Sequence, residues 1–137
     1  MSFTYSLPVR FSDVDHAGIV YYPRFFHYFH VAFEELWRAR LGGHAYRDLL
    51  DKERVGFPAV SAECDFHSPL RFGDVADVEL TIKKLGGKSI DFRYVVSCAG
   101  KRCAEGRVTC AVGELSQFRA IVVPEHVRAL LADLVEP

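Results

Sequence analysis

Residues 23–43 read PRFFHYFHVAFEELWRARLGG, and this stretch decides which folds are open to the chain. Its large apolar side chains recur at intervals of three and four residues, the spacing of one face of an α-helix. Pro23 suits the first turn of a helix and Gly42 suits the position after the last, so we predict a helix of about 19 residues. The aromatic side chains spread beyond one narrow stripe, which indicates that other structure wraps the helix on more than one side.

On both sides of this helix the apolar residues move to every second position, the period of strands with one buried face. Before the helix the alternation runs from Phe3 to Phe11, and Pro8 marks a strand edge or break. After the helix, the same period predicts strands around 60–66, 78–82, 90–96, 104–112 and 118–123. A further piece at residues 45–52 is expected to be helical or irregular, and a short helix is expected at 125–134.

One strand, one long helix and then a series of hairpin-connected strands is an α+β pattern. We expect an antiparallel sheet of five to six strands wrapped around the long helix, and a single domain over residues 1–137. A curled sheet of this kind exposes an edge strand that invites pairing with a second copy. The pattern therefore predicts a homo-oligomer.

Composition excludes several classes of function. The formal net charge of −1 gives no electrostatic reason to expect a nucleic acid as partner. No stretch longer than nine residues lacks a charged side chain, so no segment could cross a membrane. The segment 1–10 lacks the basic and apolar regions of a secretion signal, so we expect a cytoplasmic protein.

The four cysteines show no C-x-x-C pair, which makes them a poor zinc or redox framework. We expect buried free thiols. An alternative is a cross-strand bridge between Cys98 and Cys103, which flank a probable hairpin turn. The four are Cys64, Cys98, Cys103 and Cys110.

The polar segment DVDHAG at residues 13–18 lies directly before the long helix. Read as a calcium loop starting at Asp13, it lacks an oxygen ligand at its fifth and twelfth positions, which are Ala17 and Arg24. A carboxylate beside a helix start has another use, because the free N–H groups there can polarise a carbonyl while the acid attacks it or activates water. The sequence has no nucleophile elbow, dinucleotide fingerprint or Walker loop. Acyl transfer to water is the chemistry that remains.

Residues 13–23, DVDHAGIVYYP, resemble the active-site segment of the hot-dog fold thioesterases of the 4-hydroxybenzoyl-CoA thioesterase type, written D-x-D-x-x-G-[IV]-V-[YFW]-[YH]-P. The similarity continues through SPLRFGD at 68–74 and LGGKS at 85–89, and covers about residues 3–130. This resemblance implies a hot-dog fold and hydrolysis of acyl-CoA thioesters, without metal or other cofactor. It also implies a homodimer or a homotetramer built as a dimer of dimers.

Carried over by position, the resemblance makes Asp15 the catalytic carboxylate, as nucleophile or general base, and the backbone N–H of Tyr22 the group that polarises the thioester carbonyl. Asp13 and Gly18 match supporting positions of the substrate site. Lys88 and Ser89 match the turn that meets the phosphates and pantetheine arm of CoA. His16 stands where the family often has proline, and Gly86 and Gly87 stand where one branch has arginines. Tyr22 favours the aryl-CoA branch.

Several alternatives stay open. A hydratase would need a His paired with an acid, and only His16 beside Asp15 is available. A non-catalytic module that binds or senses acyl-CoA, and a thioesterase acting on acyl-carrier protein, are further possibilities. His27, His30 and Glu34 have a spacing that some metal sites use, but no third His or Cys joins them, and we expect helix-surface or interface residues. The sequence leaves the acyl group undetermined.

Overall fold

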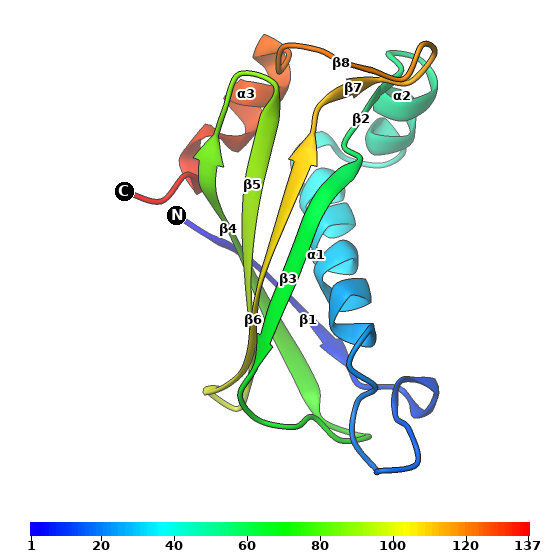
Figure 1. Ribbon diagram of the computed structural model, residues 1–137, viewed down its shortest axis with the longest axis vertical. Helices are drawn as coiled ribbons and strands as arrows, with labels where there is room; N and C mark the ends of the chain where they lie inside the picture. The colour runs from blue at the N-terminus through cyan, green and yellow to red at the C-terminus, as the bar shows by residue number, and fades with distance from the viewer.

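Helix α1 (Arg24–Leu41) lies across one face of a five-stranded antiparallel sheet in the computed structural model, which describes residues 1–137 (Figure 1). The predicted α+β architecture and the long helix are confirmed. The main sheet has five strands, where five to six were expected. In spatial order its strands are β1 (Phe3–Pro8), β4 (Val75–Leu85), β5 (Ser89–Cys98), β6 (Lys101–Ala111) and β3 (Ala59–Phe66).

Short elements close one end of the molecule. A small sheet joins β2 (Val55–Gly56), β7 (Gly113–Glu114) and β8 (Arg119–Ala120) in that order. The pieces expected at residues 45–52 and 125–134 are both helical, as α2 (Ala45–Asp51) and α3 (Glu125–Leu131), and one-turn 3₁₀ helices cover Phe11–Asp13 and Ala132–Leu134. None of these helices has the length and apolarity needed to cross a membrane.

The close approach of α1 to the sheet depends on Gly106 in β6. A Cβ atom built on Gly106 would lie only 2.2 Å from Cε2 of Phe29. The Phe29 ring therefore occupies the space that any other residue at position 106 would fill, and it stacks on Tyr94 with ring centroids 4.7 Å apart. The side of α1 that faces the sheet is completely buried through Phe25, Tyr28, Phe29, Ala32, Phe33, Leu36 and Trp37.

The predicted strand over residues 3–11 is too long, because β1 ends at Pro8. Beyond it the backbone N–H of Arg10 donates to the side chain of Asp13, which turns the chain into a 3₁₀ helix. Phe11 consequently projects outward and is 79% exposed. Alternation alone could not show this, because the turn depends on a buried carboxylate three residues ahead.

Two other strand predictions are corrected. The final strand over 118–123 is reduced to Arg119–Ala120, since Phe118 adopts a left-handed backbone and both Phe118 and Val122 are largely exposed. In β3 the register shifts between Ala59 and Ser61, so Val60 is an extra residue and is 66% exposed instead of buried. A bulge breaks the alternation of faces that the prediction assumed.

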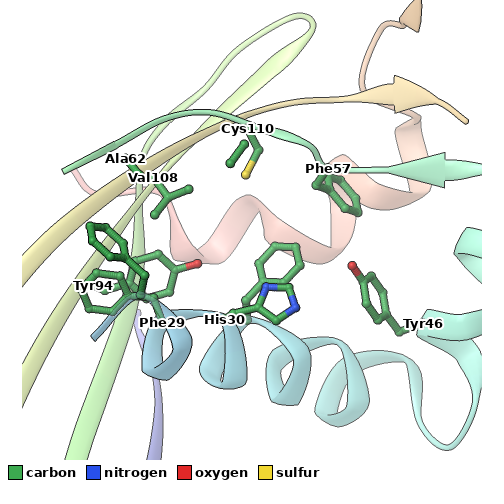
Figure 2. Close-up of a pocket in the computed structure, with 11 residues that line it drawn as sticks. Phe29, His30, Tyr46, Phe57, Ala62, Tyr94, Val108 and Cys110 are labelled. Atoms are coloured by element: carbon green, nitrogen blue, oxygen red, sulfur yellow. The ribbon is translucent and has the colours of Figure 1, made fainter. Parts of the chain in front are cut away.

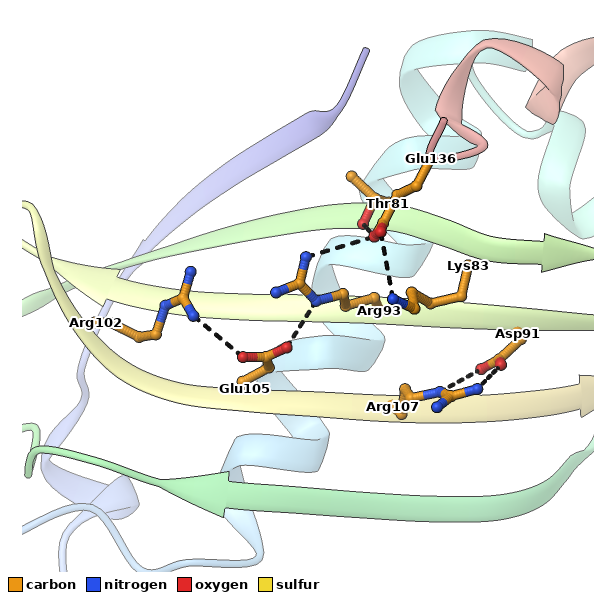
Figure 3. Close-up of polar contacts among 8 residues, drawn as sticks. All are labelled: Thr81, Lys83, Asp91, Arg93, Arg102, Glu105, Arg107 and Glu136. Carbon is orange, nitrogen blue, oxygen red and sulfur yellow. Dashed lines mark hydrogen bonds and ion pairs between the residues drawn. The ribbon is translucent and has the colours of Figure 1, made fainter.

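The sheet face that points away from α1 carries a network of charged side chains (Figure 3). Arg93 pairs with Glu105 and with Glu136, while Thr81 donates a hydrogen bond of 2.6 Å to the Glu136 carboxylate. That hydrogen bond and the nearby Lys83 and Arg93 hold the pKa of Glu136 below its ordinary value. Together with the backbone bond from Glu136 N–H to Ile82 C=O, the network fixes the chain terminus along β4.

All four cysteines are free, as expected, although only Cys103 and Cys110 are fully buried. The alternative of a Cys98–Cys103 bridge is wrong, because Cys98 lies opposite Lys101 in the β5–β6 hairpin. Burial raises the pKa of the Cys64 and Cys110 thiols to about 11.

The contact between Phe29 and position 106 gives a stability prediction. Gly106→Ala should lower the free energy of unfolding by about 1–3 kcal/mol, because the added methyl group forces the helix away from the sheet. Urea denaturation measures the loss. Gly87→Ala is the matched control, since a Cβ at Gly87 meets no atom within 4 Å. Equal stability of the two variants would contradict the proposed close contact.

Candidate active site

Asp15 lies at the tip of a tight hairpin between β1 and α1. Its backbone N–H donates to the carbonyl of Ile19 at 3.0 Å, and its own carbonyl accepts from Gly18 N–H at 3.0 Å. One carboxylate oxygen, Oδ1, accepts a hydrogen bond of 2.8 Å from Ala17 N–H. Gly18 closes this turn with a φ of +81°, a conformation that L side chains rarely adopt. The hairpin thus holds the Asp15 carboxylate in solvent with its second oxygen unbonded.

Asp13 anchors this hairpin to the helix. It is the one charged residue that is buried, at 5% exposure. Its Oδ2 accepts hydrogen bonds from Arg10 N–H at 2.9 Å and from the Tyr28 hydroxyl at 3.0 Å, and its backbone carbonyl accepts from Tyr21 N–H at 2.9 Å. The Arg24 guanidinium lies 3.8 Å from the other carboxylate oxygen. A supporting role for Asp13, expected from the sequence, agrees with this geometry.

The backbone N–H of Tyr22 is free. The amides that follow Pro23, those of Arg24, Phe25 and Phe26, donate to carbonyls three residues earlier, whereas the Tyr22 amide has no acceptor. The start of α1 therefore offers one unused donor. Beside it lies a cavity of about 350 Å³ lined by Ile19, Val20, Tyr22, Phe25, Phe66, His67, Ser68, Pro69 and Leu70.

The hairpin contributes a wall of this cavity through Ile19 and Val20. Val20 N–H donates to Leu70 C=O at 2.8 Å, which ties the hairpin to the loop between β3 and β4. Asp15 itself does not line the cavity but lies on the same hairpin. The structure thus groups Asp13, Asp15, Gly18 and Tyr22 at one end of the molecule.

Lys88 and Ser89 lie at the opposite end of the sheet, in the turn between β4 and β5 (Figure 1). With 11 residues in β4, the two ends are roughly 35 Å apart at about 3.4 Å per residue. Both residues are exposed. One chain therefore does not bring them to the Asp15 hairpin.

The histidines of α1 form no metal site. His30 pairs with Glu34 at 3.0 Å on the exposed side of the helix. No group of three or more His, Cys, Asp or Glu side chains is placed to hold a metal ion.

The sequence pattern, which showed Tyr28 only as one more aromatic side chain of the predicted helix, did not reveal its role. The side chain is buried, and its hydroxyl supplies the hydrogen bond that connects α1 to the Asp13 carboxylate. Burial, together with this hydrogen bond, raises the pKa of the Tyr28 phenol well above its ordinary value, so it stays protonated as a donor. A tyrosine among phenylalanines on a buried helix face was the available signal, since a buried hydroxyl needs a partner.

Comparison with known proteins shows the family to which the chain belongs. The model of a family described as the thioesterase-like superfamily matches residues 9–131. The chain belongs to this superfamily. A 1,4-dihydroxy-2-naphthoyl-CoA hydrolase from Nostoc punctiforme is 36% identical over 99 residues, which make up 72% of this chain and 66% of that protein.

Solved structures of the superfamily share the whole fold. A thioesterase superfamily protein from Jannaschia sp. CCS1 superposes with a TM-score of 0.92 at 29% identity, over 99% of this chain and 94% of the other. A 1,4-dihydroxy-2-naphthoyl-CoA thioesterase from Synechocystis superposes with a TM-score of 0.87 at 25% identity over all of both chains. The hot-dog fold expected from the resemblance is confirmed.

The contact between Tyr28 and Asp13 predicts a coupled loss of stability and activity. Tyr28→Phe removes one of two donors from a buried carboxylate and should cost about 1.5–3 kcal/mol of unfolding free energy. Any hydrolytic turnover should fall with it, because the Asp15 hairpin loses one of the contacts that attach it to α1. Urea denaturation and steady-state kinetics measure the two effects. Tyr5→Phe, at a tyrosine without a hydrogen bond on β1, is the control and should change neither quantity.

Proposed function

We propose that this protein hydrolyses acyl-CoA thioesters to the free acid and CoA, with the Asp15 carboxylate and the Tyr22 amide as its catalytic groups. The observation that carries the proposal is the pairing of a free helix-start N–H beside a cavity with an exposed carboxylate on the adjoining hairpin. A thioester carbonyl that accepts from the Tyr22 N–H gains stabilisation as negative charge develops on its oxygen.

Two routes from this arrangement to products are chemically consistent. In the first, an Asp15 carboxylate oxygen attacks the thioester carbon, the C–S bond breaks and CoA leaves as its thiolate; water then hydrolyses the mixed anhydride and supplies the proton that the thiolate takes up. In the second, the carboxylate removes a proton from water as that water attacks the same carbon, the C–S bond breaks, and the proton passes from Asp15 to the leaving CoA thiolate. Single turnover in ¹⁸O water tests for the first route, because label enters Asp15 only when water attacks the Asp15 carbon of the mixed anhydride.

The names of the relatives support an aromatic acyl group. The Nostoc protein, matched over 66% of its length, and the Synechocystis protein are both named for 1,4-dihydroxy-2-naphthoyl-CoA. We therefore propose an aryl-CoA as substrate.

A second chain would complete the site. Strand β3 is an edge of the main sheet, with no partner on its outer side. If two copies pair along β3 about a two-fold axis, the strands run antiparallel and the Lys88 turn of one chain comes to the Asp15 end of the other. Lys88 and Ser89 could then meet the phosphates and pantetheine arm of a CoA whose thioester lies at Tyr22. We propose a homodimer of this kind. A homotetramer would be built from two such dimers through surfaces other than β3.

Asp15→Asn tests the catalytic assignment. The substitution keeps the shape of the side chain but removes its charge and nucleophilicity, so hydrolysis of an aryl-CoA should fall at least about 10²-fold with unchanged stability. Asp13→Asn should reduce kcat less, because Asp13 supports the hairpin. Release of free thiol measures both. A larger loss of kcat in Asp13→Asn, at equal folding, would show that the two roles are reversed.

Mixing two variants tests the shared site. Lys88→Ala should raise KM for acyl-CoA, with a smaller effect at high salt and none on a pantetheine thioester without the nucleotide. In a heterodimer of Asp15→Asn and Lys88→Ala chains, one of the two sites combines an intact Asp15 with an intact Lys88 from the other chain. Co-expression should therefore restore activity at low substrate concentration. Activity no higher than the sum of the separate variants would refute the sharing.

A further inference from the structure

A second cavity lies along the same groove between α1 and the β3 edge of the sheet, and the catalytic proposal does not use it. Its volume is about 260 Å³. An engineered apolar cavity of roughly 150 Å³ holds benzene, so this one has room for a substituted or fused aromatic ring. It is lined by Phe26, Phe29, His30, Phe33, Tyr46, Phe57, Ala59, Ala62, Tyr94, Val108 and Cys110.

Two phenol groups and the His30 imidazole are the ring groups with polar atoms in this largely apolar space. Figure 2 shows the hydroxyl groups of Tyr94 and Tyr46 pointing into the cavity from opposite ends, with His30 between them on α1. Tyr94 is only 3% exposed as a residue, and its hydroxyl forms no hydrogen bond with another protein group; the hydroxyl is still accessible from the cavity, since Trp37 Nε1 is the one fully buried side-chain polar atom without a partner. Burial raises the pKa of Tyr94 well above its ordinary value and that of Tyr46 to about 12, so both groups stay protonated.

The lining of the cavity favours an aromatic occupant that carries a polar group. Six of the lining side chains are aromatic rings of Phe or Tyr that are fixed by stacking or edge-to-face contacts with their neighbours, and such rings accept a further aromatic ring edge-on. An alkyl chain in the same space would leave the Tyr94 hydroxyl buried without a partner, which is unfavourable. A hydroxyl group on an aromatic ring would supply that partner.

The cavity also lies at a suitable distance from the free amide. Phe26, Phe29 and Phe33 follow one another at intervals of three and four residues, so they share one stripe of α1, and Tyr22 lies in the turn two residues before that helix. Phe26 and Phe29, which line the cavity, are about 3 and 8 Å along the axis from the start of α1 at Arg24. An aroyl group of one or two rings spans this interval.

We propose that this cavity seats the aromatic ring of the acyl group, and that the Tyr94 hydroxyl selects rings that carry a hydroxyl group. The inference rests on the proposed thioesterase function and assigns its acyl specificity to a named side chain. Tyr94 is then a specificity-determining residue, and it takes no part in breaking the thioester bond.

Kinetics with matched thioesters test the assignment. The hydroxylated substrates are 4-hydroxybenzoyl-CoA and 1,4-dihydroxy-2-naphthoyl-CoA. The comparison substrates are benzoyl-CoA, which lacks the hydroxyl group, and hexanoyl-CoA, which lacks the aromatic ring. Tyr94→Phe should lower kcat/KM about tenfold for at least one hydroxylated thioester and leave benzoyl-CoA unchanged, since it keeps the ring stacked on Phe29. Tyr5→Phe should leave all four unchanged. Equal effects of Tyr94→Phe on hydroxylated and unsubstituted substrates, or no effect on any, would overturn the inference.

A binding measurement separates this inference from the catalytic proposal. Trp37 is the only tryptophan, and its ring stacks on Tyr46 and Phe57 in the cavity wall at 5.7 and 5.2 Å. Its fluorescence should therefore change when 4-hydroxybenzoate or 1,4-dihydroxy-2-naphthoate binds, with affinity about tenfold weaker in Tyr94→Phe. If the protein hydrolyses no thioester but shows this difference, the catalytic proposal fails and the aromatic site stands. If thioesters are hydrolysed and Tyr94→Phe binds both acids as tightly as the unchanged protein, only the site is wrong.

Discussion

The absence of a side chain at Gly106 sets the distance between α1 and the sheet. Phe29 enters the space above this glycine and stacks on Tyr94, so the two layers meet closely at the centre of the molecule. Toward the edge strand the sheet presents small side chains, Ala59 and Ala62, which cannot fill the space below the helix. Close packing at the centre and small residues at the edge together leave an open groove along β3.

The start of α1 opens into this groove, and a buried carboxylate holds the adjoining hairpin there. Asp13 joins the backbone of Arg10, the hydroxyl of Tyr28 and the backbone of Tyr21 at one point. Burying an acid is costly unless hydrogen bonds satisfy it, so these contacts must form together. The result is a fixed hairpin with an exposed acid at its tip. Of the two acids in this short segment, one is thereby buried and hydrogen-bonded and the other is left in solvent.

The groove contains both cavities, and they differ in chemistry. The one beside Tyr22 has the free amide and access from the hairpin, while the one beyond Phe26 is walled by aromatic rings with two inward phenols. A substrate with a polarised carbonyl at one end and a flat ring at the other fits this order. The Lys88 turn lies at the far end of the same chain, so in the proposed thioesterase it is the Lys88 of a second chain that would meet a CoA moiety extending from Tyr22.

Local patterns were sufficient for much of this protein. Three patterns depend only on residues close together in the chain: the spacing of apolar residues by three and four in α1, the alternation in the strands of the main sheet, and the segment from Asp13 to Pro23. The sequence by itself therefore determined the fold class and the family.

Tertiary contacts decided the rest. Phe11 turned outward because a buried carboxylate redirected its backbone, and Val60 did so because of a bulge in pairing with β6. The hydroxyl of Tyr28 donates a hydrogen bond to a carboxylate fifteen residues away, whereas the hydroxyl of Tyr94 has no protein partner. The packing of helix against sheet decides which of the two hydroxyls meets an acceptor. The separation of Lys88 from Asp15 likewise follows from strand direction, which no local pattern measures.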